Sequence, residues 1–149
     1  MVLIAGLGAT HRLWGELPLL MARRCRVVAV DNRGVGGSRD GEPFPLAGMS
    51  RDLLVTLDHL GVARFRLLGA SLGGLIALST AVAAPSRAEA LVVASSAARL
   101  TTHGRRSMEV LRDLLHHLPP ARMGAALMTL AFAPSFHGRF AGFVREATT

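Results

Sequence analysis

The stretch Gly69-Ala70-Ser71-Leu72-Gly73-Gly74 decides the fold of this chain. A short apolar run over residues 65–68 comes directly before it, and an apolar segment over residues 72–84 follows and ends at Pro85. Proline cannot continue a helix, because it lacks the backbone N–H and its ring clashes with the preceding turn. The pattern therefore predicts a strand, a tight turn with Ser71 at its tip, and a helix.

The same alternation of short apolar runs and helical patterns extends on both sides of this unit. Further strands are predicted over residues 2–5, 26–30 and 90–94, and further helices over residues 14–23 and 49–60. Apolar strands that are separated by helices are typical of a parallel sheet that is covered on both faces. The predicted fold class is therefore α/β, a parallel sheet with helices on both faces.

A helical block follows the last predicted strand. Residues 107–118 carry apolar side chains at helical spacing, residues 123–132 form a second apolar segment, and a third is indicated by Phe136, Phe140 and Phe143. This block has no further strand pattern. We therefore divide the chain into a sheet-containing part, residues 1–100, and a helical part, residues 101–149.

Length and composition limit the class of protein. The chain has 149 residues and one cysteine, Cys25, so no disulfide can form within it. No apolar run approaches the roughly 20 residues that a membrane span needs, and the first residues lack the pattern of a secretory signal. A lack of disulfides is compatible with a reducing compartment. We therefore expect a cytoplasmic protein that makes no contact with a membrane.

The formal net charge of +7 balances seventeen arginines against ten acidic residues, without a single lysine. The arginines are scattered along the chain, and aromatic residues make up 5% of it. Nucleic-acid-binding proteins usually concentrate basic residues on one face or helix and add aromatic side chains for stacking. We therefore expect no nucleic-acid partner.

Ser71 is the predicted catalytic residue. A sharp turn between a strand and a helix exposes a serine hydroxyl at the start of that helix, and Gly69 and Gly73 suit the crowded backbone of such a turn. The hydroxyl is a weak nucleophile until a base takes its proton. The alternative is a serine that caps the helix, with the glycines serving close packing.

Two backbone amides are predicted to stabilise negative charge on a substrate oxygen beside Ser71. Leu72 supplies one because it follows the serine, and Leu7 supplies the other from the turn Gly6-Leu7-Gly8 after the first strand. This turn also matches the opening of a dinucleotide-binding fingerprint. The third glycine of that fingerprint is missing, and Asp31 is the acidic residue that could hydrogen-bond a ribose hydroxyl. We expect no cofactor and keep dinucleotide binding as an alternative.

Taken together, residues 1–100 resemble the α/β hydrolase family. The segment Asp31-x-Arg33-Gly34-x-Gly36-x-Ser38 is similar to the family's loop signature, and residues 3–8 look like its oxyanion turn. Residues 57–61 and 96–100 look most like the enol-lactonase and small-esterase branch. The resemblance implies that Ser71 attacks a small-molecule ester or lactone substrate. It also implies that residues 101–149 begin a helical cap over the site.

Two features depart from the family's pattern. Ala5-Gly6 stands where the family often has His-Gly, and the family's catalytic acid and histidine usually follow two later strands that this sequence does not contain. Six histidines are candidates for the base, and each is more often structural, because a base must lie within about 3 Å of the serine oxygen. These are His11, His59, His103, His116, His117 and His137. None of them clusters with the spacing of metal ligands, so we expect no metal.

The resemblance also predicts where the sheet is unpaired. The family's strand order places the strands over residues 26–30 and 90–94 at the two edges, and unpaired edges invite pairing with another chain. We therefore expect self-association through these edges, and a serine hydrolase that is weak or inactive as this chain. The alternatives are a non-catalytic, hydrolase-like binding module, a fragment completed by another chain, and perhydrolysis or carbon–carbon cleavage on a similar scaffold.

Overall fold

The chain folds into two compact units, Met1–Ala98 and Arg99–Thr149. The computed structural model describes residues 1–38, 45–119, 122 and 126. The first unit contains the sheet, and the second begins with a single helix.

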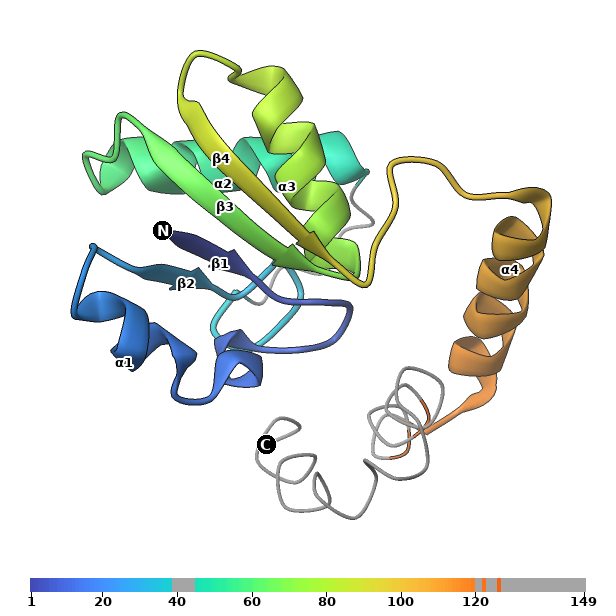
Figure 1. The fold of residues 1–149 in the computed structure, drawn as a ribbon. Coiled ribbons are helices and arrows are strands. Elements are labelled where there is room, and N and C mark those ends of the chain that lie inside the picture. The colour runs from blue at the N-terminus through green and yellow to red at the C-terminus, as the bar shows by residue number, and fades with distance from the viewer. Residues whose placement is uncertain (39–44, 120–121, 123–125, 127–149) are drawn as a thin grey trace. The chain divides into compact units, whose positions relative to one another are not determined.

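One parallel sheet organises the first unit. Its strands are β1 (Val2–Ile4), β2 (Val28–Val30), β3 (Phe65–Ala70) and β4 (Ala88–Ala94), in the spatial order β2-β1-β3-β4. All pairings are parallel, so the carboxyl ends of the four strands point the same way in Figure 1. The predicted α/β fold class is confirmed, and the second and fourth strands form the edges of the described sheet, as predicted.

Two helices pack together against the sheet. α2 (Leu46–His59) and α3 (Leu72–Ala83) contact each other, and α3 also contacts β1, β3 and β4. Burial of each large apolar side chain between these layers stabilises the fold by about 1.5–3 kcal/mol relative to exposure. The buried cluster consists of Val2, Ile4, Met49, Leu53, Leu57, Phe65, Leu67, Ile76 and Ala77.

The segment between β1 and β2 forms two short helices rather than the single helix predicted over residues 14–23. The 3₁₀ helix η1 (His11–Trp14) ends at Gly15, and α1 (Leu17–Ala22) follows. Gly15 has a φ of 51°, which glycine adopts without the steric cost of a Cβ atom. The 3₁₀ helix and α1 are therefore separate elements between β1 and β2 (Figure 1).

β4 is an edge strand with exposed apolar side chains. Leu91 and Val92 are 36% and 51% exposed. An exposed apolar edge can pair with another chain. Self-association through the sheet edges stays a prediction.

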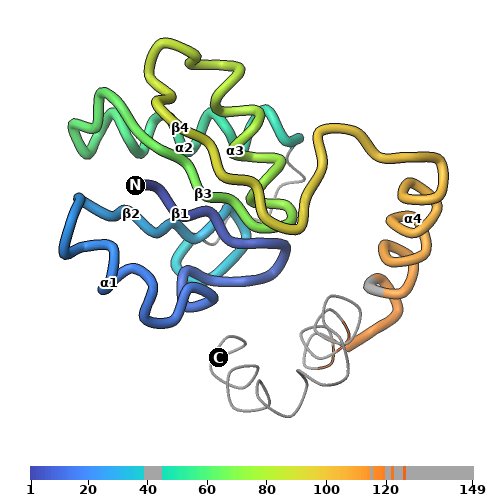
Figure 2. Tube along the Cα trace, viewed as in Figure 1, coloured from blue at the N-terminus to red at the C-terminus, as the bar shows by residue number. Residues whose placement is uncertain are grey.

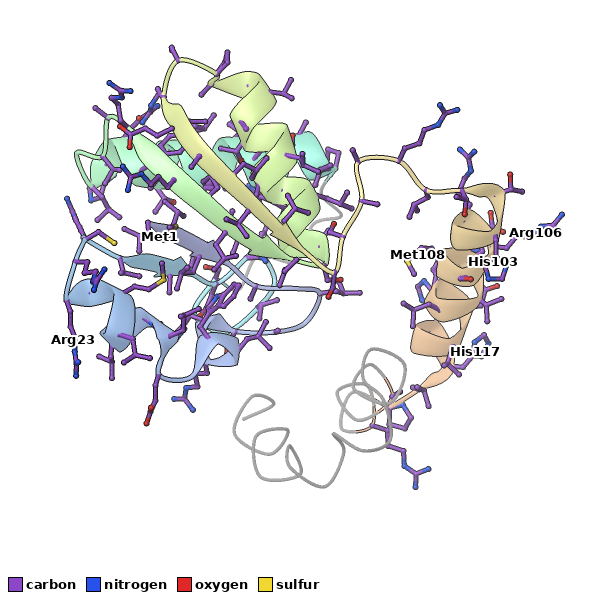
Figure 3. The ribbon with its side chains drawn as sticks, in the orientation of Figure 1. Met1, Arg23, His103, Arg106, Met108 and His117 are labelled. Atoms are coloured by element: carbon purple, nitrogen blue, oxygen red, sulfur yellow. The ribbon has the colours of Figure 1, made fainter. Side chains whose placement is uncertain are left out.

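The second unit begins with α4 (Thr102–His117), which Thr101 caps by accepting a hydrogen bond from the Gly104 amide at 3.1 Å. The predicted start at residue 107 is wrong, because this cap begins the helix earlier. Figure 3 shows Met108 on one side of α4, opposite the side that carries the labelled polar residues His103, Arg106 and His117.

Most of the predicted helical block lies outside the described residues. This applies to residues 123–125 and 127–132 of the second apolar segment, and to Phe136, His137, Phe140 and Phe143. The role of residues 101–149 as a cap stays a prediction. No helix in the part of the chain that the structure describes combines the length and the apolar content needed to cross a membrane.

Candidate active site

Ser71 lies in a strained turn at the carboxyl end of β3. Its φ of 53° and ψ of −119° fall in a region that residues with a Cβ rarely adopt, at a cost of about 1–3 kcal/mol. The Ser71 amide donates a hydrogen bond to the Ala94 carbonyl at 2.9 Å, and its carbonyl accepts one from the Gly74 amide at 2.9 Å. β4 and α3 therefore hold the turn from both sides.

The Ser71 side chain does not cap α3. A capping serine has an extended backbone, and its hydroxyl accepts a hydrogen bond from an amide in the first turn of the helix. Ser71 has a positive φ, and its hydroxyl accepts no such bond. The residue is exposed, and α3 begins directly after it at Leu72. This geometry favours a nucleophile elbow over the helix-cap alternative.

The glycines around Ser71 lie where two backbones meet too closely for a side chain. A Cβ atom on Gly69 would lie 2.7 Å from the Gly74 amide nitrogen, and a Cβ atom on Gly73 would lie 2.6 Å from the Ile4 carbonyl carbon. Real Cβ atoms essentially never approach other heavy atoms so closely. Both glycines are therefore required for the packing of α3 against β1 and β3.

The turn after β1 lies beside Ser71. A Cβ atom on Gly6 would lie 3.3 Å from Ser71 Cβ and 3.9 Å from Ser71 Oγ. The turn is closed by a hydrogen bond from the Ala9 amide to the Gly6 carbonyl at 3.2 Å, and Gly8 has a φ of 68°. The structure thus brings together the two turns that the sequence predicts to form the site.

Two backbone amides next to this hydroxyl are free. Within the described residues, neither Leu7 nor Leu72 donates a backbone hydrogen bond. The Leu72 amide belongs to the first turn of α3, where amides have no partner within the helix. Leu7 is 49% exposed. Their role as oxyanion donors stays a prediction.

Asp31 joins the loop after β2 to the segment that follows the β1 turn. Its Oδ1 accepts a hydrogen bond from the His11 amide at 2.6 Å and lies 2.9 Å from Nδ1 of the His11 ring, while Oδ2 accepts one from the Gly37 amide at 3.2 Å. Figure 2 traces these two loops at the end of the sheet where β3 runs into α3.

The hydrogen bonds of Asp31 stabilise its ionised form. Burial is the largest single influence and raises the pKa, but the bonds from the amides of His11 and Gly37 and from the His11 ring together outweigh it. The pKa of Asp31 is therefore lowered from 3.8. Both carboxylate oxygens are engaged within the chain, which does not fit the free ribose-binding acid of the dinucleotide alternative.

The next two residues of the same loop also reach across to other elements. Asn32 Nδ2 donates a hydrogen bond to the Ala5 carbonyl at 2.9 Å, and Asn32 is 8% exposed. The Arg33 guanidinium binds both oxygens of Asp52 on α2, at 2.7 and 2.5 Å. The D-x-R-G-x-G-x-S pattern of the sequence indicates that this loop is important, but it does not indicate that Asn32 bonds the Ala5 carbonyl or that Arg33 binds Asp52.

Among the described residues of the first unit, no histidine or carboxylate hydrogen-bonds the Ser71 hydroxyl. His11 is engaged with Asp31, and His59 is exposed at the end of α2. The histidines of α4 belong to the second unit, and His137 lies outside the described residues. Within the described residues of the first unit, the structure therefore brings no base to Ser71.

Two cavities of the first unit lie elsewhere. One of about 470 Å³ lies between the loop after β2 and α2, and one of about 410 Å³ lies at the amino ends of β1 and β3. Ser71 lines neither of them. Across residues 1–38 and 45–119, no three His, Cys, Asp or Glu side chains are grouped so that they could hold a metal ion.

The sequence matches a known family and is similar to several known proteins. The model of the alpha/beta hydrolase fold family matches residues 1–147. A Cronobacter sakazakii protein that carries the name carbamate hydrolase RutD is 36% identical over 91% of this chain and 52% of its own length. One of the same name from Enterobacter cloacae is 38% identical over 77% of this chain and 44% of its own length. The chain thus spans about half the length of these relatives.

Solved structures of hydrolases also match nearly the whole of this chain and about half of their own length. A hydrolase from Pseudomonas aeruginosa PA01 matches 99% of this chain and 56% of its own, with a TM-score of 0.83 and 30% identity. The enol-lactonase of Burkholderia xenovorans LB400 matches the same shares with a TM-score of 0.84 and 22% identity. At that identity, the second match shows the fold alone.

Proposed function

Because the chain belongs to the α/β hydrolase fold family, we propose that it carries the nucleophile of a serine hydrolase that cleaves a small ester, lactone or carbamate. The observation that carries this proposal is the backbone of Ser71, which is strained, exposed and free of a capping bond at the end of β3. The turn that contains Leu7 lies beside it. The relatives that carry the name carbamate hydrolase support the inclusion of carbamates.

In the proposed reaction, Ser71 Oγ attacks the carbonyl carbon of the substrate while its proton passes to a base. The carbonyl oxygen becomes an oxyanion that accepts hydrogen bonds from the amides of Leu7 and Leu72. The intermediate then expels an alcohol or amine, which leaves with the proton. Water finally hydrolyses the acyl-enzyme. The loss of one oxyanion donor typically costs about 2.7–4 kcal/mol of transition-state stabilisation.

The proposal assigns the base and its supporting acid to polypeptide outside the described residues. Two observations support this: no described histidine of the first unit contacts Ser71, and the chain spans about half the length of the matched relatives. Members of a catalytic triad act as a unit, so the loss of one costs almost as much as the loss of all. We therefore expect the chain by itself to react slowly.

A fluorophosphonate reagent tests the proposal, because it phosphonylates an activated serine without the need for a matched substrate. The wild-type chain and two variants, Ser71→Ala and Ser95→Ala, are incubated at high reagent concentration and analysed by intact mass. Ser95 is the matched control, since it too is an exposed serine with a positive φ, 50°, at the end of the neighbouring strand. We expect labelling that Ser71→Ala abolishes and Ser95→Ala leaves in place.

Labelling that survives Ser71→Ala, or no labelling of the wild-type chain, would contradict the proposal for this chain. The second outcome would favour the other candidate, a non-catalytic hydrolase-like module. That candidate is supported by the absence of a base beside Ser71 among the described residues of the first unit. Binding of a small apolar ester that is the same in the wild-type chain and in Ser71→Ala would identify it.

A further inference from the structure

Two adjacent residues of the β2 loop hold the two ends of the turn that carries Leu7. We propose that Asp31 and Asn32 are positioning residues that clamp this oxyanion turn and so aim the Leu7 amide at the substrate oxygen. This inference rests on the proposed function and extends it, because neither residue touches the reacting atoms.

Asn32 holds the end at which the turn leaves β1. Its Nδ2 donates a hydrogen bond to the Ala5 carbonyl at 2.9 Å, one residue before Gly6. Asn32 is 8% exposed and Ala5 is fully buried. A hydrogen bond in such a place competes little with water, and its removal leaves a buried carbonyl group without a partner.

Asp31 holds the opposite end of the turn. Its Oδ1 accepts a hydrogen bond from the His11 amide at 2.6 Å. The Asp31 side chain is 13% exposed, whereas the His11 side chain is 52% exposed. Oδ2 is fixed by the Gly37 amide. A hydrogen bond to a carboxylate is about twice as strong as a neutral one. The backbone of His11, more than its exposed ring, is therefore the anchored group.

The short segment between the two ends has little freedom of its own. The Ala9 amide donates to the Gly6 carbonyl at 3.2 Å, and Thr10 Oγ1 accepts from the Arg12 amide at 3.4 Å. With both ends fixed and the turn closed, the Leu7 amide has a defined direction. A misplacement of about 1 Å at such a donor can cost about 100-fold in rate.

The substitution His11→Pro removes one of the two hydrogen bonds that hold the turn. His11 is the first residue of η1, and Thr10 before it has an extended backbone with ψ of 173°. Proline is tolerated at the first position of a helix, and the residue before proline favours this extended conformation. His11→Pro therefore deletes the amide that Asp31 accepts. His11→Ala is the matched variant, because it removes the ring and keeps the amide.

The clamp predicts different effects for these two variants. We expect His11→Pro to slow the phosphonylation of Ser71 by about tenfold or more, since one donor is misaligned, and His11→Ala to slow it by less than about threefold. The loss in His11→Pro falls on the inactivation rate constant and not on the dissociation constant of the reagent, because an oxyanion donor acts in the transition state. Asp52→Asn, which breaks the ion pair of Arg33 beside the clamp, is the control for general loosening of the loop.

A second readout follows the turn itself. The Ala9 amide is protected from hydrogen exchange by the Gly6 carbonyl, so its exchange rate reports whether the turn is closed. We expect His11→Pro and Asn32→Ala each to speed this exchange by at least about tenfold. The first removes a hydrogen bond to a charged carboxylate, and the second leaves the buried Ala5 carbonyl without the Asn32 donor. His11→Ala and Asp52→Asn are expected to leave it close to the wild-type rate.

Each outcome decides the proposal. The clamp is overturned if His11→Pro and His11→Ala label at the same rate, or if Ala9 exchanges in His11→Pro and Asn32→Ala as in the wild-type chain. If the wild-type chain is not labelled at Ser71, the proposed function fails. The exchange of Ala9 then decides the clamp alone, so the two failures are distinguishable.

Discussion

At the residue scale, conformational strain is concentrated at the ends of two neighbouring strands. Ser71 and Ser95 are the non-glycine residues with positive φ in the described part of the chain, at 53° and 50°. Of the two, Ser71 is followed directly by a helix, which places backbone amides next to its hydroxyl. Strain of this kind persists only when the surrounding structure enforces it, and it is often found at functional sites.

Because the Ser71 backbone is strained, glycine at this position is expected to give a more stable protein than alanine, which is the reverse of the order inside a helix. Glycine adopts a positive φ without steric cost, so Ser71→Gly is expected to be about 1 kcal/mol more stable to unfolding than Ser71→Ala. Ser79 lies inside α3 and is the matched control, where glycine is expected to be about 1 kcal/mol less stable than alanine. Urea unfolding of the four variants measures both differences. The same sign at both positions would contradict the strained turn.

The lowered pKa of Asp31 predicts a dependence of stability on pH. A carboxylate whose folded pKa lies below its unfolded value stabilises the fold above the unfolded value, about 3.8 here, and this contribution is lost as the pH falls through the folded pKa. Asp31→Asn is therefore expected to destabilise the chain at pH 7 and to flatten the fall in stability below about pH 4.

Unfolding in urea at several pH values measures this profile. Glu16→Gln is the control, because Glu16 is exposed and its carboxylate forms no hydrogen bond or ion pair with the described residues. A profile of Asp31→Asn that is parallel to the wild-type profile would contradict the assignment of Asp31 as an engaged, ionised carboxylate.

At the scale of elements, the contact between α3 and β1 is set by a missing side chain. A Cβ atom on Gly73 would lie 2.5 Å from the Ala5 carbonyl oxygen, so the helix would have to move away from the strand. Gly73→Ala is expected to lower the free energy of unfolding by about 1–3 kcal/mol, as overpacking does.

Gly61→Ala is the control for this test, because it adds a Cβ atom at a position with backbone strain but without steric overlap. Gly61 has a φ of 66°, but a Cβ atom there would meet nothing within 4 Å. This control is expected to cost about 1 kcal/mol. Equal losses in the two variants, measured by urea unfolding, would show that the close approach of α3 is not what Gly73 provides.

The elements also show which features a sequence can predict. The turn at Ser71 was predictable because its glycines, flanking strand and following helix are all local signals. The break at Gly15 and the start of α4 at Thr102, after its cap Thr101, were missed, because a glycine turn and a cap have weak patterns beside a long apolar stripe.

The contact between His11 and Asp31 could not be predicted from local patterns. It joins residues 20 positions apart, and its geometry depends on how two loops meet at the end of the sheet. The same holds for Asn32, which reaches back to the Ala5 carbonyl across 27 positions. The loop signature indicated that these residues matter, but the folded chain was needed to identify their partners.

At the scale of the whole molecule, the exposed side chains of β4 predict self-association. Val92 on this edge strand is 51% exposed, and a charged side chain on an edge opposes pairing with another strand. We expect the wild-type chain to form dimers or larger species, and Val92→Lys to shift it toward the monomer in sedimentation velocity experiments. Val82→Lys is the control, because Val82 is 81% exposed but belongs to α3 and not to a strand. Equal effects of the two substitutions would contradict pairing through β4.

The most direct test of the nucleophile assignment is a crystal structure of the chain after reaction with the fluorophosphonate. We expect a phosphorus atom bonded to Ser71 Oγ, with one phosphonyl oxygen about 2.7–3.1 Å from the amide nitrogens of both Leu7 and Leu72. An adduct on another residue, an oxygen that points away from these amides, or a chain that forms no adduct would contradict it.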